Sequence, residues 1–160
     1  MSSAGSIDSY KDTLLTVLTA FKPRYVYEWG PGFSTDTIAA FPTVEHIDSV
    51  EHSPNWYEAY LRRKPLNVQL MLRTGEEYTR VSGRFNEYDL FFVDGIDRPE
   101  CIKDAKKHLK DGGVIVLHDA ERPQYQGVIM GFDYYFFTDD GHTCVMTDNE
   151  NTNRILLGVL

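Results

Sequence analysis

The stretch Y-V-Y-E-W-G-P-G-F-S-T, residues 25–35, joins a short apolar run to a glycine turn and then to the beginning of a helix. The apolar run at 25–29 has the length and composition of a buried strand. Gly30 and Gly32 allow a tight turn, and Ser34 has a side chain that caps helices well. A strand, a glycine turn and a helix in this order predict the first crossing of a doubly wound sheet, where such sheets bind ligands.

Strand and helix patterns alternate around this turn. Buried strands, with near-continuous apolar residues, are predicted at 25–29, 44–50, 68–72, 90–93 and 114–117, the last after an Asp-Gly-Gly turn at 111–113. Helices, with apolar residues at helical spacing or with capping residues, are predicted at 8–21, 34–41, 54–63, 76–81 and 99–109. Apolar strands separated by helices are typical of a parallel sheet that helices cover on both faces. The predicted fold class is therefore α/β, a doubly wound Rossmann-like sheet.

The end of the chain departs from this alternation. Residues 134–160 contain three strand-like runs and no long helix between them. Asp140-Gly141 is a hairpin signal, and residues 148–153 have the composition of a polar turn. We expect the parallel sheet to end in an antiparallel hairpin that two of the three runs form.

Composition disfavours several classes of partner. The formal net charge is −8, from 16 basic and 24 acidic residues, whereas nucleic acids and anionic membranes require a concentrated positive face. No apolar run approaches the roughly 18 residues of a membrane span, and the first residues lack a secretory signal pattern, so a cytoplasmic location is expected. Cys101 and Cys144 are expected to be free thiols. The length fits one domain, 1–160, with an N-terminal helical segment at 1–23.

Two acids define the ligand that the glycine turn suits. Glu51 ends the second strand, about 20 residues after the turn, where a carboxylate can accept both hydroxyls of a ribose. Glu28 stands two residues before Gly30, where it would repel a pyrophosphate and attract an ammonium group. Thr35 replaces the third glycine of the dinucleotide fingerprint. The turn therefore suits a cationic nucleoside such as S-adenosylmethionine.

Five motifs extend this interpretation: E-W-G-P-G-F-S-T at 28–35, V-E-H-S at 50–53, T-G-E at 74–76, F-V-D-G at 92–95 and G-G-V-I-V-L-H-D at 112–119. Together they resemble the class I S-adenosylmethionine-dependent methyltransferases, over nearly the whole chain from residue 24 to residue 160. The resemblance implies a sheet of order 3-2-1-4-5-7-6 with strand seven antiparallel, in agreement with the expected terminal hairpin.

The resemblance also implies a role for each motif. Glu28 would hold the methionine amino group, directly or through water, and Glu51 would bind the ribose hydroxyls. Asp94, at the end of strand four, would lie next to the sulfonium. The other implied cofactor-binding positions are Gly30, Pro31 and Gly32 along the methionine and ribose, and Gly75 and Glu76 beside the adenine.

A second group of polar residues follows strands four and five. These strands are neighbours in the expected topology, so their carboxyl ends bring 93–97 close to 117–121. A cluster of acids there is unfavourable unless it is protonated or bound to a cation. Oxygen ligands with one imidazole suit Mg²⁺ or Mn²⁺. The side chains concerned are Asp94, Asp97, His118 and Asp119.

This stretch is similar to small-molecule O-methyltransferases, including sugar O-methyltransferases. Those enzymes carry D-G-D after strand four and D-D after strand five, hold a divalent ion with them and deprotonate a hydroxyl. The chain departs from the pattern twice, with D-G-I-D at 94–97 and with His118-Asp119 in place of D-D. Either Asp94, His118 and Asp119 hold an ion, or no metal is used. Without a metal, His118 is the preferred general base; with one, His118 is a ligand and a weak base such as Asp97 is enough. In both cases Asp94 lies beside the reacting methyl group.

The expected function is S-adenosylmethionine-dependent methyl transfer to a hydroxyl of a small molecule, with or without a divalent ion. The alternative is a non-catalytic S-adenosylmethionine-binding module or a subunit of a larger complex. A nicotinamide-dependent oxidoreductase is disfavoured by Glu28 and by the terminal hairpin. Only 8–21, 120–130 and the aromatic run 134–137 are available as walls for the acceptor, and the aromatic run is more typical of core and sheet face. The acceptor site is therefore either open or completed by another subunit of a homo-oligomer.

Overall fold

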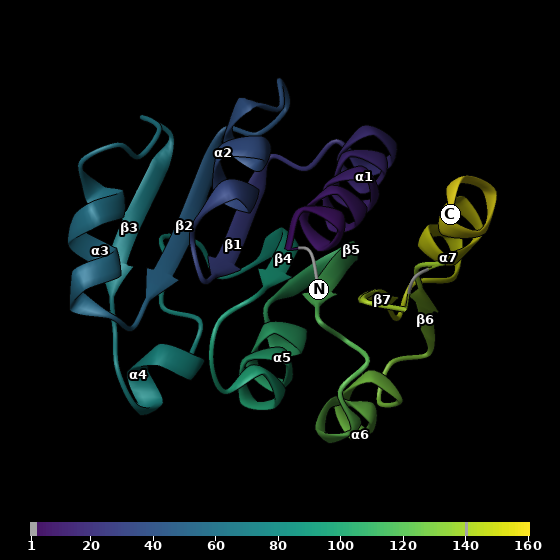
Figure 1. The fold of residues 1–160 in the computed structure, drawn as a ribbon. Helices are drawn as coiled ribbons and strands as arrows, with labels where there is room; N and C mark the ends of the chain where they lie inside the picture. Colours follow the sequence, from purple (N-terminus) through teal and green to yellow (C-terminus); the bar gives the residue numbers. More distant parts are fainter. Residues whose placement is uncertain (1–2, 140) are drawn as a thin grey trace.

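The computed structural model describes residues 3–139 and 141–160, which form a seven-stranded sheet with helices on both faces (Figure 1). The strands lie in the order β3-β2-β1-β4-β5-β7-β6. Neighbouring strands are parallel except at β7, which is antiparallel to both β5 and β6. The predicted fold class, strand order and terminal hairpin are thus confirmed. The strands are β1 (Tyr25–Trp29), β2 (His46–Glu51), β3 (Val68–Leu72), β4 (Tyr88–Val93), β5 (Leu109–His118), β6 (Tyr134–Phe137) and β7 (Thr143–Thr147).

Two hydrophobic cores, one on each face, hold the helices to the sheet. The helices are α1 (Ser3–Phe21), α2 (Phe33–Ala40), α3 (Pro54–Leu61), α4 (Glu76–Thr79), α5 (Arg98–Lys107), the 3₁₀ turn η1 (Pro123–Tyr125), α6 (Gln126–Ile129) and α7 (Glu150–Val159). Helices α4, α5 and α6 cover one face, and α1, α2, α3 and α7 cover the other (Figure 1). Successive residues of a strand point to opposite faces, so Tyr27 and Trp29 enter one core and Val26 enters the other.

The first two of the three strand-like runs form the hairpin, and the last forms the helix α7, so its strand-like pattern was misleading. The side chain of Asn149 caps this helix by accepting a hydrogen bond from the backbone N–H of Thr152 at 2.9 Å. Leu156 is buried in the core that includes α1, whereas Ile155 and Leu157 remain exposed. A short run of adjacent apolar residues does not distinguish a strand from a helix, and here the cap and the packing decide.

Of two glycine-containing turns predicted from the sequence, one forms a turn and the other lies within a strand. Between β6 and β7, Gly141 has a φ of +75°, in line with the hairpin signal, while Asp140 lies outside the described residues. The turn predicted at 111–113 instead lies inside β5, where the register against β4 shifts. A Cβ on Gly113 would approach the carbonyl oxygen of Asp89 to 2.8 Å, so glycine lets the irregular strand stay close to its neighbour.

Two further expectations can be compared with the structure. Cys101 and Cys144 are both buried and both free, as predicted. Among the described helices, none combines the length and the apolar character that crossing a bilayer requires.

Candidate functional site

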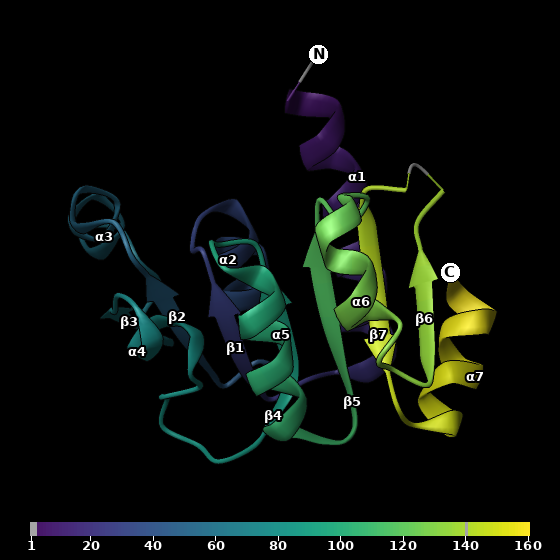
Figure 2. The ribbon, with the colours of Figure 1, turned by 90° about the horizontal axis from the view of Figure 1, so that it is seen from below.

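The candidate residues gather at one edge of the sheet, where β1, β2, β4 and β5 end. The chain leaves β1 toward β2 on one side and reaches β4 on the other, so the sheet has a topological switch point between β1 and β4. Helix α1 begins beyond this edge and then runs back along the sheet (Figure 2). The site is therefore built from strand ends, with one helix standing over it.

Glu28 lies in the interior beside the glycine turn, with no exposed surface. Its carboxylate accepts hydrogen bonds from the hydroxyls of Ser34 at 2.6 Å, Ser49 at 3.0 Å and Thr35. Burial raises the pKa of Glu28 to about 7, although these three bonds oppose the rise. The carboxylate thus ties the first turn of α2 to β1 and β2 through neutral donors.

The glycine turn brings the ends of β1 and β4 into contact. Gly30 has a φ of +86°, and a Cβ at this position would lie 2.5 Å from the carbonyl oxygen of Asp94. A Cβ on Gly32 would meet nothing within 4 Å, which leaves open space over the turn. Pro31 is held from the other side, because its carbonyl accepts a hydrogen bond from Nε1 of Trp56 at 2.8 Å. Gly30 is therefore the position where a side chain is excluded.

Glu51 ends β2 and is nearly buried, with 5% of its surface exposed. Its Oε2 atom accepts hydrogen bonds from the backbone N–H groups of His52 at 2.8 Å and Ser53 at 2.7 Å. Its Oε1 atom makes no hydrogen bond within the described part of the chain. One oxygen is thus fixed by the backbone, and the other is left for a ligand.

The predicted adenine-side residues have different positions. Gly75, with a φ of +60°, begins α4, whereas the side chain of Glu76 is 88% exposed and pairs with Arg80. The structure does not bring the Glu76 carboxylate into the site. Tyr78, which the sequence analysis missed, holds α4 in place because its hydroxyl accepts a hydrogen bond from the backbone N–H of Ile96 at 3.2 Å.

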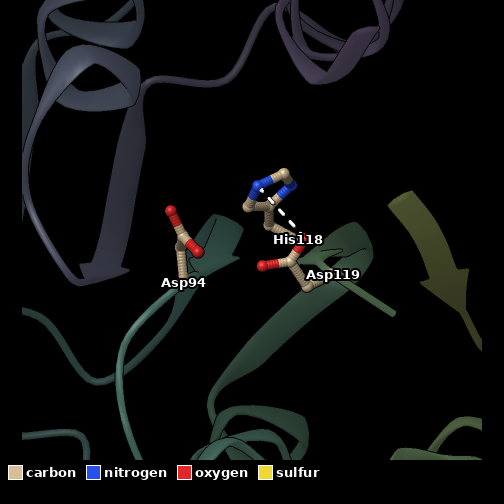
Figure 3. Close-up of side chains that lie close together, drawn as sticks. All are labelled: Asp94, His118 and Asp119. Atoms are coloured by element: carbon tan, nitrogen blue, oxygen red, sulfur yellow. Dashed lines mark ion pairs between the residues drawn. The ribbon is translucent and has the colours of Figure 1, made fainter. Parts of the chain in front are cut away.

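Asp94, His118 and Asp119 converge from the ends of β4 and β5 (Figure 3). Each offers a ligand atom, and these atoms lie within 4.8 Å of one another. Nε2 of His118 is 3.6 Å from Oδ1 of Asp119. Burial raises the pKa of Asp94, while His118 and Arg98 act to lower it. The structure thus brings together the three residues predicted to hold a metal.

Solved structures with a similar fold can now be compared with this geometry. A methyltransferase-like protein from Silicibacter pomeroyi has a TM-score of 0.69 and 17% identity over 87% of this chain and 85% of that protein. A putative caffeoyl-CoA O-methyltransferase from Staphylococcus aureus has a TM-score of 0.61 and 15% identity over 86% and 82%. The chain has the Rossmann-like methyltransferase fold.

The same fold also occurs outside methyltransferases. Spermidine synthase from Thermotoga maritima has a TM-score of 0.69 and 18% identity over 92% of this chain and 61% of that protein, so the chain spans less than two thirds of its length. No protein-family model matches the sequence, and no curated protein matches it. At these identities the likeness establishes the methyltransferase fold, and the chemistry must be argued from the site.

Two arginines that the sequence analysis missed neutralise the acids of this methyltransferase fold. Arg98, which is buried, lies 3.3 Å from Oδ1 of Asp94 and donates a hydrogen bond to the carbonyl of His118 at 2.6 Å. Arg122, half exposed, lies 3.6 Å from Oδ2 of Asp119. Their spacing of four and three residues from the acids was a signal in the sequence, but only the fold brings both pairs to one place.

Asp97 does not join the group, although the sequence analysis made it a candidate base. It is exposed and has a φ of 48°, in the left-handed region. It stands at the N-terminus of α5, where its side chain makes no capping hydrogen bond. The structure therefore leaves His118 as the candidate base inside the cluster of acids.

Tyr10 of α1 is a further residue that the sequence analysis missed, although it expected helix 8–21 to supply a wall. Its ring is buried, with its centroid 4.8 Å from that of His118 and 5.9 Å from that of Phe92. Burial raises the pKa of Tyr10 to about 12, and the charges of Asp94 and Glu28 add to the rise. Tyr10 therefore covers His118 from the α1 side and keeps its proton at neutral pH.

Proposed function

We propose that this chain is an S-adenosylmethionine-dependent methyltransferase that acts on a hydroxyl group of a small molecule. The observation that carries the proposal is the contact between the Gly30 turn and the backbone of Asp94, beside a Glu51 carboxylate with one unoccupied oxygen. This arrangement offers adjacent places for a nucleoside and for a reacting group at the switch point of the sheet. The methyltransferase fold supports the same assignment.

The cofactor would lie across the ends of β1, β2 and β4. Glu51 would accept hydrogen bonds from the ribose hydroxyls through Oε1, the oxygen that the backbone leaves unoccupied. Glu28 is enclosed by three hydroxyl donors, which favours contact with the methionine amino group through water over direct contact. The remaining proposed contacts are Gly30, Pro31 and Gly32 along the methionine and ribose, Gly75 and the backbone of Glu76 beside the adenine, and Asp94 near the sulfonium.

The transfer itself requires orientation and a base. The acceptor oxygen attacks the methyl carbon in line with the carbon–sulfur bond, which breaks as the carbon–oxygen bond forms. The hydroxyl proton passes to Nε2 of His118, because an imidazole accepts a proton near neutral pH and lies within the cluster. Arg98 and Arg122 hold the two carboxylates in place beside it.

A divalent ion is the second way to activate the acceptor. Asp94, His118 and Asp119 would hold it, since two oxygen donors and one nitrogen donor within 4.8 Å fit Mg²⁺ or Mn²⁺. Such an ion would make the acceptor hydroxyl more acidic. The two arginines already balance the two carboxylates, and this favours the metal-free base.

Calorimetry with S-adenosylhomocysteine and S-adenosylmethionine tests the proposal. Glu51→Ala is expected to weaken binding by about 1–3 kcal/mol, because the ribose hydroxyls lose their acceptor. Glu58→Ala removes an exposed acid from α3 and serves as the control, with unchanged affinity expected. Tighter binding of a nicotinamide cofactor would overturn the proposal. Binding of S-adenosylmethionine without methyl transfer to any of a panel of small hydroxylated acceptors would favour the non-catalytic module.

A further inference from the structure

Where β5 ends and β7 begins, two buried polar atoms have no hydrogen-bond partner in the part of the chain that the structure describes. They are Nδ1 of His118 and Oγ1 of Thr143. The two residues lie directly opposite each other in the antiparallel pairing of β5 with β7. An unpaired polar atom in a protein interior is rare and costly, so a neighbouring pair of them calls for a physical explanation.

The pairing geometry brings the two atoms within reach of each other. Side chains of directly opposed residues project from the same face of a sheet, with their Cβ atoms about 4.5–5.5 Å apart. Oγ1 of Thr143 is bonded to its Cβ, and Nδ1 of His118 is one atom further from its own. A rotation of the Thr143 side chain, or one bridging water, is enough to join them.

The backbone of Thr143 is already held, which leaves its hydroxyl as the adjustable group. Its N–H donates to Oγ1 of Thr138 at 3.3 Å, and its carbonyl accepts from the backbone N–H of Thr138 at 2.8 Å. The ring of His118 packs against the ring of Tyr10, and its Nε2 atom lies 3.6 Å from Oδ1 of Asp119. Nδ1 is the ring nitrogen that has no partner in the described part of the chain.

We propose that Thr143 is the positioning residue of His118. The hydroxyl of Thr143 accepts a hydrogen bond from Nδ1–H, directly or through one buried water, so that the proton stays on Nδ1 and the lone pair of Nε2 is free on the side of Asp94 and Asp119. A base that acts through Nε2 requires this tautomer, and an imidazole that ligates a metal through Nε2 requires it too. The catalytic part of this inference rests on the proposed function, whereas the tautomer does not.

Nitrogen chemical shifts of histidine measure the tautomer directly. The protein is labelled with ¹⁵N-histidine, freed of metal with a chelator, and studied at one pH at which the imidazoles are neutral. His118→Asn assigns the signal by its disappearance. The wild type is expected to carry the proton mainly on Nδ1. Thr143→Val, which replaces the hydroxyl with a methyl group, is expected to shift the ratio of the tautomers by about fivefold toward Nε2–H, as loss of an ordinary hydrogen bond would.

Two further variants keep this test falsifiable. Thr143→Ser retains a hydroxyl and is expected to keep the wild-type ratio. Thr147→Val is the matched control, because Thr147 is also buried in β7 but donates its hydroxyl proton to the carbonyl of Gly113 at 3.0 Å. It is expected to leave the His118 signal unchanged. The same ratio in Thr143→Val as in the wild type, or an equal shift in Thr147→Val, would overturn the proposal.

The outcome is separable from that of the proposed function. Calorimetry with S-adenosylhomocysteine is expected to give the same affinity for Thr143→Val and the wild type, because Thr143 lies on β7, away from the cofactor strands. If the wild type fails to bind the cofactor, the proposed function fails while the tautomer result stands. If the cofactor binds and the tautomer ratio ignores Thr143, only the positioning role fails.

Discussion

The two halves of the site satisfy their carboxylates by different means. At the ends of β1 and β2, Glu28 is enclosed by three hydroxyl groups and Glu51 is bonded to two backbone N–H groups. At the ends of β4 and β5, Asp94 and Asp119 each face a guanidinium group. The cofactor half of the site, with Glu28 and Glu51, is built from neutral donors. The acceptor half, with Asp94 and Asp119, is built from opposed charges.

The backbone differs in the same way. In the cofactor half the positive φ angles belong to glycines, Gly30 and Gly75, which adopt them without strain. In the acceptor half they belong to Asp97 and Asp119, at 48° and 52°. Strained residues and paired charges persist only where the surrounding structure holds them. The backbone of the cofactor half is therefore held without strain, whereas in the acceptor half two aspartates adopt a conformation that favours glycine.

Removing the buried guanidinium should give the largest effect. Arg98→Met leaves the half-buried Asp94 carboxylate without its partner and two carbonyls without their donor, so a loss of about 3–4 kcal/mol in the free energy of unfolding is expected. Arg122→Met, which removes a half-exposed guanidinium, should cost less than about 1 kcal/mol. Urea unfolding measures both. Equal losses would contradict the view that burial makes the Asp94 pair the costly one.

The Glu28 carboxyl should make stability depend on pH. Burial raises its pKa from an ordinary 4.5 to about 7, so between these values the folded state holds a proton that the unfolded state has released. The free energy of unfolding therefore falls as the pH rises from 4.5 to 7, by up to about 3 kcal/mol for this group. Glu28→Gln has no such proton, so the difference between wild type and variant should change across this window. A difference that stays constant would show that the three hydroxyl donors fully offset the burial.

Relief of backbone strain should give the smallest effect. Asp97 and Lys22 share a φ of 48°, but Lys22 follows α1 and lies outside the site. Lys22→Gly is expected to stabilise the protein by about 1 kcal/mol, and Asp97→Gly by about 0.5 kcal/mol, because aspartate tolerates this conformation better than lysine. Urea midpoints measure both changes. A loss of stability at Asp97 alone would indicate that its carboxylate has an undetected partner and that the acceptor half is less strained than the comparison suggests.

Sequence patterns predicted the elements of the sheet well where the spacing of the apolar residues fitted a single kind of element. The near-continuous apolar strands and the glycine turn at 30–32 lie where they were expected, and so does the hairpin. The patterns did not predict the structure where the same residues are compatible with more than one kind of element. The apolar residues 155–160 fit a strand or a helix equally, and the Asp-Gly-Gly at 111–113 fits a turn or an irregular strand. In both places, contacts with distant parts of the chain decided the outcome.

The residue types at the strand ends could be predicted from the sequence, because strand period, turn chemistry and capping depend on near neighbours in the chain. The sequence was therefore enough to predict the fold class and the presence of acids at Glu28, Glu51 and Asp94. The partners of those acids, in contrast, depend on the tertiary structure. That Tyr10 covers His118, and that Thr143 stands opposite it, follows from packing and strand register between segments far apart in the chain. The chemistry of a polar group depends on its burial and on its hydrogen-bond and ion-pair partners, and both arise only when the chain folds.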